Sequence, residues 1–241
     1  MENKAIYKRV LLKLSGEALS VGGTGVLNFE IVDKICKAIK ELSDSGTQVA
    51  LVVGAGNIWR GRSSGKMDKT RADHMGMLAT TINAIALQDA LCNLGKKARV
   101  FTAVDISRFA EPYSRDEVVS ALEAGEVVVF GCGLGSPFFS TDTAAVLRAI
   151  EINADAALFA KNIDGVYSDD PNVNPDAVKY DVLTYEEILR NNLRAIDLTA
   201  AALSLDNNLN IVVFKLDKPE DILRAASGET VGTLLKRGND K

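Results

Sequence analysis

Histidine, cysteine and tryptophan are scarce in this chain of 241 residues, which contains one histidine, three cysteines and one tryptophan. His74 alone cannot supply the imidazoles that most zinc sites or a Ser-His-Asp triad require. Cys36, Cys92 and Cys132 are odd in number and widely spaced, so we expect free thiols rather than a disulfide framework. Free thiols are typical of a reducing compartment, and we therefore expect a cytoplasmic protein.

Long apolar runs and concentrated positive charge are also missing. We find no apolar stretch of membrane-spanning length, and the N-terminal residues MENKAIYKR lack the apolar core of a signal peptide. The net charge of −4 comes without any run of lysine and arginine, which argues against a general nucleic-acid binder. We therefore expect neither a membrane nor a nucleic acid among the partners of this protein.

Apolar, β-branched runs alternate with segments of helical periodicity along the whole chain. The runs predict strands at 10–14, 48–53, 98–103, 127–130, 155–160, 210–216 and 232–235, with helices between them. Such alternation is typical of an α/β fold with a mainly parallel sheet and helices on both faces. Because we find no linker and no internal repeat, we expect residues 1–241 to form a single domain.

Helix boundaries are marked by residue types that cap helix ends. One apolar periodicity predicts a helix over 29–42, and another predicts a long helix over 75–94 after a polar, mobile segment at 63–73. The candidate N-terminal caps are Asp73, Asp197, and the capping boxes Ser114–Glu117 and Thr184–Glu187. The segment 75–94 carries more apolar and small residues than a fully solvated helix, which suits a subunit interface as well as a core.

One stretch combines the three features of an anion site. The buried strand at 127–130 is followed by a glycine-rich turn at 131–135 and by a helix that opens at 140–143. Glycine lets backbone N–H groups approach a phosphate, and the helix dipole favours negative charge there. The alternative is a tight turn capped by Thr141 or Asp142, and this stretch alone leaves both interpretations open.

Charged side chains accompany two further strand ends. Lys13 interrupts the apolar run at 10–14, either as an edge-strand residue in water or as a cation aimed at a phosphate. The strand at 48–53 leads into a glycine turn and then Arg60 and Arg62, which suit oxyanions but are also ordinary surface residues. Neither G-x-x-x-x-G-K-[ST] nor G-x-G-x-x-G occurs. Several glycine turns with Lys13, arginines and nearby carboxylates suit phosphoryl transfer between two phosphorylated ligands.

Five separated motifs carry a resemblance to a known family. They are Lys13-Leu14-Ser15-Gly16-Glu17-Ala18-Leu19, Gly54-Ala55-Gly56-Asn57 with Arg60-Gly61, Asp73-His74-Met75-Gly76-Met77-Leu78, Gly135-Ser136-Pro137-Phe138-Phe139-Ser140-Thr141-Asp142 and Asp164-Gly165-Val166-Tyr167. In this order they resemble the bacterial uridylate kinases of the amino-acid kinase superfamily, from Lys8 to about Leu235. The resemblance implies a three-layer α/β/α sandwich that transfers the γ-phosphoryl group of ATP to UMP, giving ADP and UDP in pyrimidine nucleotide biosynthesis.

The resemblance also implies a set of site residues, with UMP bound mainly by the N-terminal part and ATP mainly by the C-terminal part. The implied catalytic residues are Lys13, Asp142 and Arg60, with Asp142 orienting the lysine. ATP would contact Lys13, Leu14, Ser15, Gly16, Gly56, Arg60, Asn162, Tyr167 and Asp170. UMP would contact Ala55, Asp73, Leu134, Gly135, Ser136, Pro137, Phe138, Phe139, Ser140 and Thr141. Mg²⁺ would be held through the ATP phosphates without a direct protein ligand, and Asp197 is a weaker candidate for the phosphate–metal network.

Two departures from the family pattern bear on these assignments. Ala55 stands where the family often has glycine, so its contact should be through backbone only. The segment at 160–164 is one residue shorter than in some relatives, which leaves open whether Lys161 or Asn162 contacts ATP. The family is also hexameric, with GTP as activator and UTP as inhibitor in many members, although the loop at 21–26 matches the activation loop in position only.

Two other interpretations compete with this one. A superfamily relative that phosphorylates a carboxylate, such as an acetylglutamate kinase, should lack Asp73 and the Pro137-Phe138-Phe139 run. A nucleotide-sensing protein without turnover has no need of both Lys13 and Asp142. The presence of these residues favours the kinase of a nucleoside monophosphate over either alternative.

Overall fold

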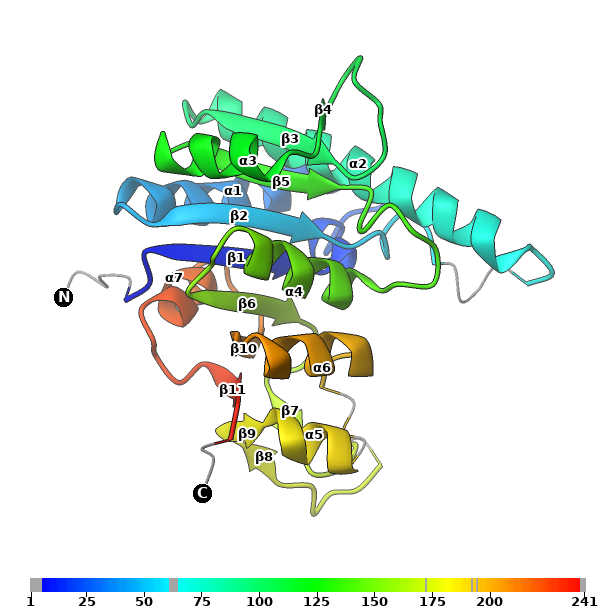
Figure 1. Ribbon diagram of the computed structural model, residues 1–241, viewed down its shortest axis with the longest axis vertical. Coiled ribbons are helices and arrows are strands. Elements are labelled where there is room, and N and C mark those ends of the chain that lie inside the picture. The colour runs from blue at the N-terminus through cyan, green and yellow to red at the C-terminus, as the bar shows by residue number, and fades with distance from the viewer. Residues whose placement is uncertain (1–5, 61–64, 172, 192, 194, 239–241) are drawn as a thin grey trace.

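The fold is organised on one large sheet, shown in the computed structural model of Figure 1, which describes residues 6–60, 65–171, 173–191, 193 and 195–238. Nine strands lie in the order β4-β3-β5-β2-β1-β6-β10-β11-β9, and β7 and β8 form a separate pair. Six strands make up its centre: β1 (Arg9–Leu14), β2 (Gln48–Val53), β3 (Ala98–Thr102), β5 (Val127–Gly131), β6 (Ala156–Lys161) and β10 (Asn210–Lys215). They run parallel, so their C-terminal ends meet at one edge.

Short strands complete the two margins of the large sheet. They are β4 (Glu111–Pro112), β9 (Val182–Thr184) and β11 (Gly232–Lys236), while β7 (Val166–Tyr167) and β8 (Lys179–Tyr180) make the small sheet. The strand β11 runs antiparallel to β10, and the other neighbouring strands described in the large sheet run parallel. The expectation of a mainly parallel sheet is therefore confirmed.

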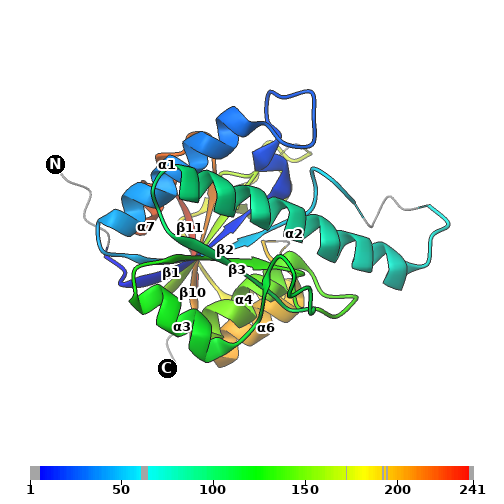
Figure 2. The same cartoon turned by 90° about the horizontal axis from the view of Figure 1, so that it is seen from above.

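Helices cover both faces of the sheet, which gives the expected three layers (Figure 2). One face carries α1 (Phe29–Asp44), α2 (Lys69–Asn93) and α7 (Asp221–Ala226), and the other carries α3 (Arg115–Glu123), α4 (Thr141–Glu151), α5 (Tyr185–Asn191) and α6 (Leu198–Asp206). Successive strand side chains point to opposite faces, so Leu12 of β1 joins the first core and Leu11 the second. Both faces are apolar because both are buried.

Lys13 lies inside the sheet and not at its edge. Its strand β1 pairs with β2 on one side and β6 on the other, and Lys13 is 9% exposed. The alternation of side chains places Lys13 on the same face as Leu11, toward α4. The edge-strand interpretation is therefore wrong, because a buried lysine requires a partner and α4 supplies one.

The helix α2 begins earlier than its apolar periodicity predicts. It starts at Lys69, and the carboxylate of Asp68 caps it by accepting the N–H of Arg71 at 3.1 Å. Asp73 lies inside the helix, so the prediction that it caps the helix is wrong, as is the expectation of a mobile segment at 69–73. Two of the early residues, Lys69 and Arg71, are exposed, so little apolar pattern marks the first turn.

The length and composition of α2 also correct an expectation about membranes. With 25 residues and a mean hydropathy of 1.2 over its most apolar window, α2 passes the simple test for a membrane-spanning helix. Within the structure, 44% of that window is buried, and the helix packs on β3, β5 and α1. The criteria concern length and composition only, and a core helix of an α/β fold can also meet them.

Two of the remaining predicted caps are formed, at Thr184 and Asp197. The Thr184 hydroxyl donates to the Glu187 carboxylate at 2.7 Å, and the Glu187 N–H returns to the Thr184 hydroxyl at 3.3 Å. Asp197 caps α6 through the N–H of Ala200. The predicted box at Ser114 is wrong, since the Ser114 side chain makes no capping bond and Glu117 lies 3.5 Å from Arg99. The cap of α4 is Ser140, so the interpretation of Thr141 or Asp142 as its cap is wrong.

Candidate active site

Two lysines and one aspartate meet at the C-terminal edge of the central strands. Lys13 Nζ lies 3.1 Å from Asp142 Oδ1, and Lys161 Nζ lies 2.8 Å from Asp142 Oδ2. Lys13 is in β1, Asp142 is in the first turn of α4, and Lys161 is the last residue of β6. Lys161 also donates to the carbonyl of Ala195 at 2.7 Å. We call Lys13, Asp142 and Lys161 the charged triad.

The charged triad has one net positive charge, because two ammonium groups face one carboxylate. Burial opposes ionisation of Asp142, but Lys13 and Lys161 outweigh it and lower the pKa of this carboxyl below its ordinary value. Burial lowers the pKa of Lys161, and the attraction of Asp142 offsets only part of that effect. A partly buried site with surplus positive charge suits an anionic group such as a transferring phosphoryl.

Two glycine turns pack directly against each other beside the charged triad. A Cβ atom built on Gly16 would lie 2.5 Å from the carbonyl oxygen of Gly54 and 2.8 Å from the nitrogen of Gly56. Real Cβ atoms do not approach backbone so closely, so only glycine fits at position 16. The short 3-10 helix Gly16–Leu19 continues from this turn. Both turns follow strands that point to the same edge, where α/β sheets bind ligands.

Glu17 connects three parts of this edge. One of its carboxylate oxygens accepts from Arg60, and the other accepts from Asn162 Nδ2 at 2.8 Å. The Arg60 side chain is otherwise exposed, so it can exchange this partner for a phosphate. Gly61 and Arg62, the neighbours of Arg60 in the sequence-based hypothesis, lie outside the described residues.

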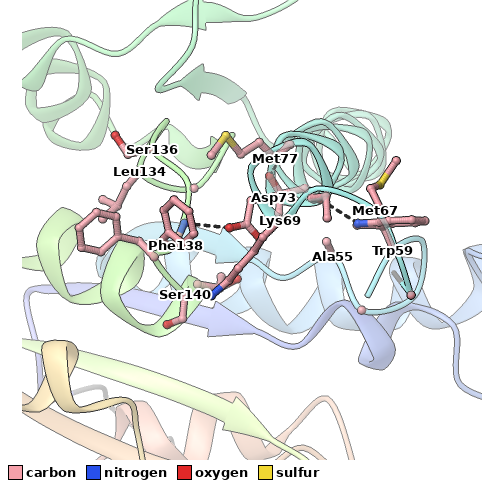
Figure 3. Close-up of a pocket in the computed structure, with 18 residues that line it drawn as sticks. Ala55, Trp59, Met67, Lys69, Asp73, Met77, Leu134, Ser136, Phe138 and Ser140 are labelled. Carbon is pink, nitrogen blue, oxygen red and sulfur yellow. Dashed lines mark hydrogen bonds between the residues drawn. The ribbon is translucent and has the colours of Figure 1, made fainter. Parts of the chain in front are cut away.

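A cavity of about 640 Å³ opens between α2 and the loop that follows β5 (Figure 3). Eight of the predicted UMP-binding residues line it: Ala55, Asp73, Leu134, Ser136, Phe138, Phe139, Ser140 and Thr141. Gly56, predicted to bind ATP, lines the same cavity. Among the described residues, Gly135 and Pro137 belong to the loop without lining the cavity. The volume is in the range of small-molecule sites. We call it the acceptor cavity.

Asp73 ties α2 to the far wall of the acceptor cavity. Its Oδ2 accepts the backbone N–H of Phe138 at 2.8 Å, as Figure 3 shows. Phe138 has φ of +72°, a conformation that costs energy for a bulky residue and needs support from its surroundings. Lys69 Nζ lies 4.9 Å from the centre of the Phe138 ring. Asp73 therefore shapes this wall, and its second oxygen takes part in no bond recorded among the described residues.

A second cavity, of about 1000 Å³, is lined in part by Val166 and Tyr167 of β7. Three of the predicted ATP-binding residues, Asn162, Tyr167 and Asp170, line it. Asn162 follows Lys161 in the chain, and Ala195, whose carbonyl accepts from Lys161, also lines it. We call it the donor cavity. Thr141, next to Asp142, lines the acceptor cavity, so chain neighbours of the charged triad line both cavities.

Asp197 fastens the start of α4 to the start of α6. Its carboxylate accepts from the hydroxyls of Ser140 and Thr143, the latter at 2.9 Å, and from the N–H of Ala200. Ser140 in turn caps α4 by accepting the N–H of Asp142 at 3.0 Å. Asp197 thus helps to position Asp142, because it holds the Ser140 hydroxyl that accepts the N–H of Asp142.

The structure brings together residues that the motifs place far apart, and it adds others. Of the predicted ATP-binding residues, Lys13, Leu14, Ser15 and Gly16 form the end of β1 and its turn, next to Gly56 and Arg60. Residues whose importance the sequence analysis missed or left undecided are Glu17, Asn57, Asn83, Thr143 and Lys161. The signal that identifies Lys161 is a lysine at the C-terminal end of a buried apolar strand: Lys161 is the last residue of β6, and Lys13 is the last but one of β1.

Comparison with known proteins agrees with this geometry. Residues 8–215 match the model of the amino acid kinase family. Uridylate kinase of Streptococcus thermophilus is 51% identical over 233 residues, which cover 95% of each chain. Among solved structures, UMP kinase of Bacillus anthracis superposes with a TM-score of 0.91 at 40% identity, covering 95% of this chain and 96% of the other.

Two further structures show how widely the architecture is shared. UMP kinase of Ureaplasma parvum has a TM-score of 0.91 at 35% identity, over 95% of this chain and 99% of that one. Uridylate kinase of Archaeoglobus fulgidus has a TM-score of 0.73 at 30% identity, over 94% and 99% of the two chains. The family model covers most of the sequence, the relatives match nearly end to end, and the solved structures share the sheet. On this basis the chain belongs to the amino acid kinase family.

Proposed function

We propose that this protein is a UMP kinase, which transfers the γ-phosphoryl group of ATP to UMP and produces UDP and ADP for pyrimidine nucleotide biosynthesis. The observation that carries the proposal is a charged triad whose chain neighbours, Thr141 and Asn162, line two cavities of nucleotide size. A phosphoryl group moving from one nucleotide to another must pass a point that both can reach. The uridylate kinases among its relatives support UMP as the acceptor.

The chemistry asks for positive charge and alignment more than for a base. The attacking oxygen belongs to the phosphate of UMP, which is already anionic, so no proton has to be removed. Lys13 and Lys161 neutralise charge on the transferring group, and Asp142 keeps both ammonium groups in place. Arg60 adds a further cation at the donor phosphates once it leaves Glu17.

Mg²⁺ is the implied cofactor, and the residues present fit a metal carried on ATP phosphates. In the described part of the chain, no group of three or more His, Cys, Asp or Glu side chains is arranged to hold a metal ion. Asp142 already faces two lysines, and Asp197 already accepts three hydrogen-bond donors. When bound with ATP, Mg²⁺ would neutralise negative charge on the phosphate groups of ATP.

The acceptor cavity is proposed to read both the sugar and the base of UMP. Asp73 accepts hydrogen bonds from the ribose hydroxyls with the oxygen that Phe138 does not use. The loop Leu134–Thr141 pairs with the edge of uracil through backbone groups and hydroxyls, as a lining of Ser136, Ser140 and Thr141 allows. Cytosine has a donor where uracil has an acceptor, so CMP should be a poor substrate.

A coupled assay of ADP release tests the proposal directly. UMP, CMP, AMP, GMP and acetylglutamate are offered as acceptors with ATP and Mg²⁺, and we expect turnover with UMP above all others. Turnover with acetylglutamate in place of UMP would identify a carboxylate kinase instead. Binding of ATP and UMP without release of ADP would identify a nucleotide sensor.

The proposal includes assembly into a closed homo-oligomer, a hexamer of three dimers. On the outer side of α2, Met75, Leu78 and Ile82 follow one helical face and are 38%, 56% and 51% exposed. An apolar stripe of this kind is typical of a face that another subunit covers. Light scattering at micromolar concentration tests it, and we expect Leu78→Glu to reduce the mass, whereas a stable unmodified monomer contradicts it.

Regulation and location complete the proposal. GTP is proposed as an activator and UTP as an inhibitor, which titration of each nucleotide into the coupled assay would test. A cytoplasmic location is supported by Cys36, Cys92 and Cys132, all free thiols. A single domain is supported by the sheet, in which β1 from the N-terminal part and β11 from the C-terminal part are strands of one structure.

A further inference from the structure

One face of α2 makes hydrogen bonds to two loops: the loop that follows β5, which we call the acceptor loop, and the Gly54–Asn57 turn that follows β2. Asp73 accepts the N–H of Phe138 at 2.8 Å, and the Thr80 hydroxyl accepts the N–H of Cys132 at 3.0 Å. Asn83 donates to the carbonyl of Gly54 at 2.8 Å. The spacings of seven and three residues place these side chains on one side of the helix. The helix therefore contacts the acceptor loop at two points and the Gly54 turn at a third.

Asn83 is the most buried of these contacts, with 0% exposure. Its amide group forms a reciprocal pair with Asn57, in which Asn83 Nδ2 donates to Asn57 Oδ1 at 2.8 Å and Asn57 Nδ2 donates to Asn83 Oδ1 at 3.0 Å. Asn57 Nδ2 also donates to the carbonyl of Val26. Because a buried amide left without partners is costly, this pair specifies one arrangement of the Gly54–Asn57 turn.

The Gly54–Asn57 turn lies at the C-terminal edge of the central strands, where the charged triad is found. The Gly54 N–H donates to the carbonyl of Leu14 at 2.9 Å, immediately after Lys13. A Cβ on Gly16 would lie 2.6 Å from Asn57 Oδ1, so the amide pair also touches the first glycine turn. A shift of Asn57 would therefore move both glycine turns relative to the charged triad.

We propose that Asn83 is a positioning residue for phosphoryl transfer. It fixes the two glycine turns relative to the acceptor loop, because α2 contacts both. Asn83 is fully buried, lines neither cavity, and acts through Asn57 and Gly54. This inference rests on the proposed function for its kinetic consequence, because the catalysed step depends on the alignment of two nucleotides. Misplacement by about 1 Å is enough to cost roughly 10²-fold in rate.

Asn83→Ala and Asn57→Ala test the role, with Gln88→Ala as a matched control. Gln88 lies on the same helix, and its amide donates to the carbonyl of Ala98 at 3.0 Å, in contact with β3 and not with either glycine turn. We expect kcat to fall about tenfold or more in both Asn variants, with the KM for UMP changed by less than about twofold. Asn57 is only half-buried, so its variant remains informative if Asn83→Ala does not fold.

The double variant shows whether the two amides act as a unit. If they do, its kcat is no lower than that of the worse single variant, since either loss breaks the same pair. Additive losses, or a loss of kcat in Gln88→Ala as large as in Asn83→Ala, would overturn the proposal.

Hydrogen exchange of the backbone amides provides a readout that needs no turnover. Peptides containing the Gly54–Asn57 turn should exchange faster in Asn83→Ala than in the unmodified protein or in Gln88→Ala. Unchanged exchange there would overturn the proposal even if activity fell. If the unmodified protein does not phosphorylate UMP, the proposed function fails, and exchange alone decides whether Asn83 holds the turn.

Discussion

Hydrogen bonds across the fold join the walls of the acceptor cavity, whereas beside the donor cavity the side chains of Tyr167, Ser168 and Asp169 bond to near neighbours in the sequence. The bond from Asp73 to Phe138 joins residues 65 positions apart, and that from Thr80 to Cys132 joins residues 52 apart. At the donor cavity, Asn162 and Val166 make long-range bonds to Glu17 and Thr233, but the Tyr167 hydroxyl bonds to Asp164 three positions away. Segments with few long-range hydrogen bonds open locally at low cost. We therefore expect the acceptor cavity to be preformed and the segment that begins at Tyr167, beside the donor cavity, to be adaptable.

This difference suits the two tasks of the enzyme. Discrimination between uracil and cytosine depends on polar groups held in fixed positions, since a mispaired edge leaves a buried group unsatisfied. The charged triad is proposed to act on both substrates, and its residues come from three elements, β1, α4 and β6. Substitutions in the charged triad should therefore reduce turnover itself, and substitutions in either cavity should affect one substrate.

The largest effect is expected for Lys13→Ala, which should lower kcat by about 10²–10³ because one preorganised cation is lost. Asp142 keeps Lys161 as a partner, so the protein should still fold. Lys96→Ala is the matched control: Lys96 is similarly buried, lies 3.0 Å from Asp44, and is remote from both cavities. Steady-state kinetics and melting temperature are measured together, and a folded Lys13→Ala variant with near-normal kcat contradicts the assigned role.

Asp142→Asn should lower kcat by about 10² through misplaced ammonium groups, without removing a proton acceptor. The pKa of Asp142 is below its ordinary 3.8, so its carboxylate is ionised throughout neutral pH. The stabilising ion pairs are present above 3.8 and are lost as the pH falls through the lower folded value. The kcat of the unmodified enzyme should thus show no change near neutral pH that is due to titration of Asp142. A change of kcat near neutral pH that this substitution abolishes would show that Asp142 acts as a base.

Asp73→Ala should raise the KM for UMP by about tenfold or more, since hydrogen bonds to a charged carboxylate are worth about 1.5–3 kcal/mol. The KM for ATP should hardly change, because Asp73 lines the acceptor cavity and not the donor cavity. Asp68→Ala removes the true cap of α2 and serves as the control. It should cost about 1 kcal/mol of stability and leave both KM values unchanged. Equal effects of the two substitutions on UMP would reduce Asp73 to a structural residue.

The smallest effect is expected on the donor side. If the Tyr167 ring stacks on the adenine of ATP, Tyr167→Ala loses about 1–3 kcal/mol of binding and raises the KM for ATP alone. Tyr167→Phe keeps the ring and removes only the hydroxyl that bonds to Asp164 at 3.0 Å, so its KM should stay near normal. If Tyr167→Phe is as defective as Tyr167→Ala, the hydroxyl and not the ring carries the contact.

Local patterns in the sequence determined most of the elements of this fold. Buried β-branched runs predicted the central strands to within one or two residues, because strands covered on both faces must be apolar throughout. The capping box at Thr184 and the cap at Asp197 depend on neighbours three residues away, so the sequence alone predicts them. The predicted box at Ser114 is not formed, because Glu117 lies instead 3.5 Å from Arg99, which is 18 positions away in the sequence.

Tertiary structure alone decided which side chains meet. The pairing of Lys13 with Asp142 and of Asp142 with Lys161 depends on two parallel strands, β1 and β6, that end at the edge where α4 begins. Asn83 reads from the sequence as an ordinary helix residue, and only the crossing of α2 over the Gly54 turn gives it a partner. Propensity and periodicity act over a few residues, whereas these bonds join residues 19 to 129 positions apart. Contacts at that range form only once the sheet has brought the strand ends together.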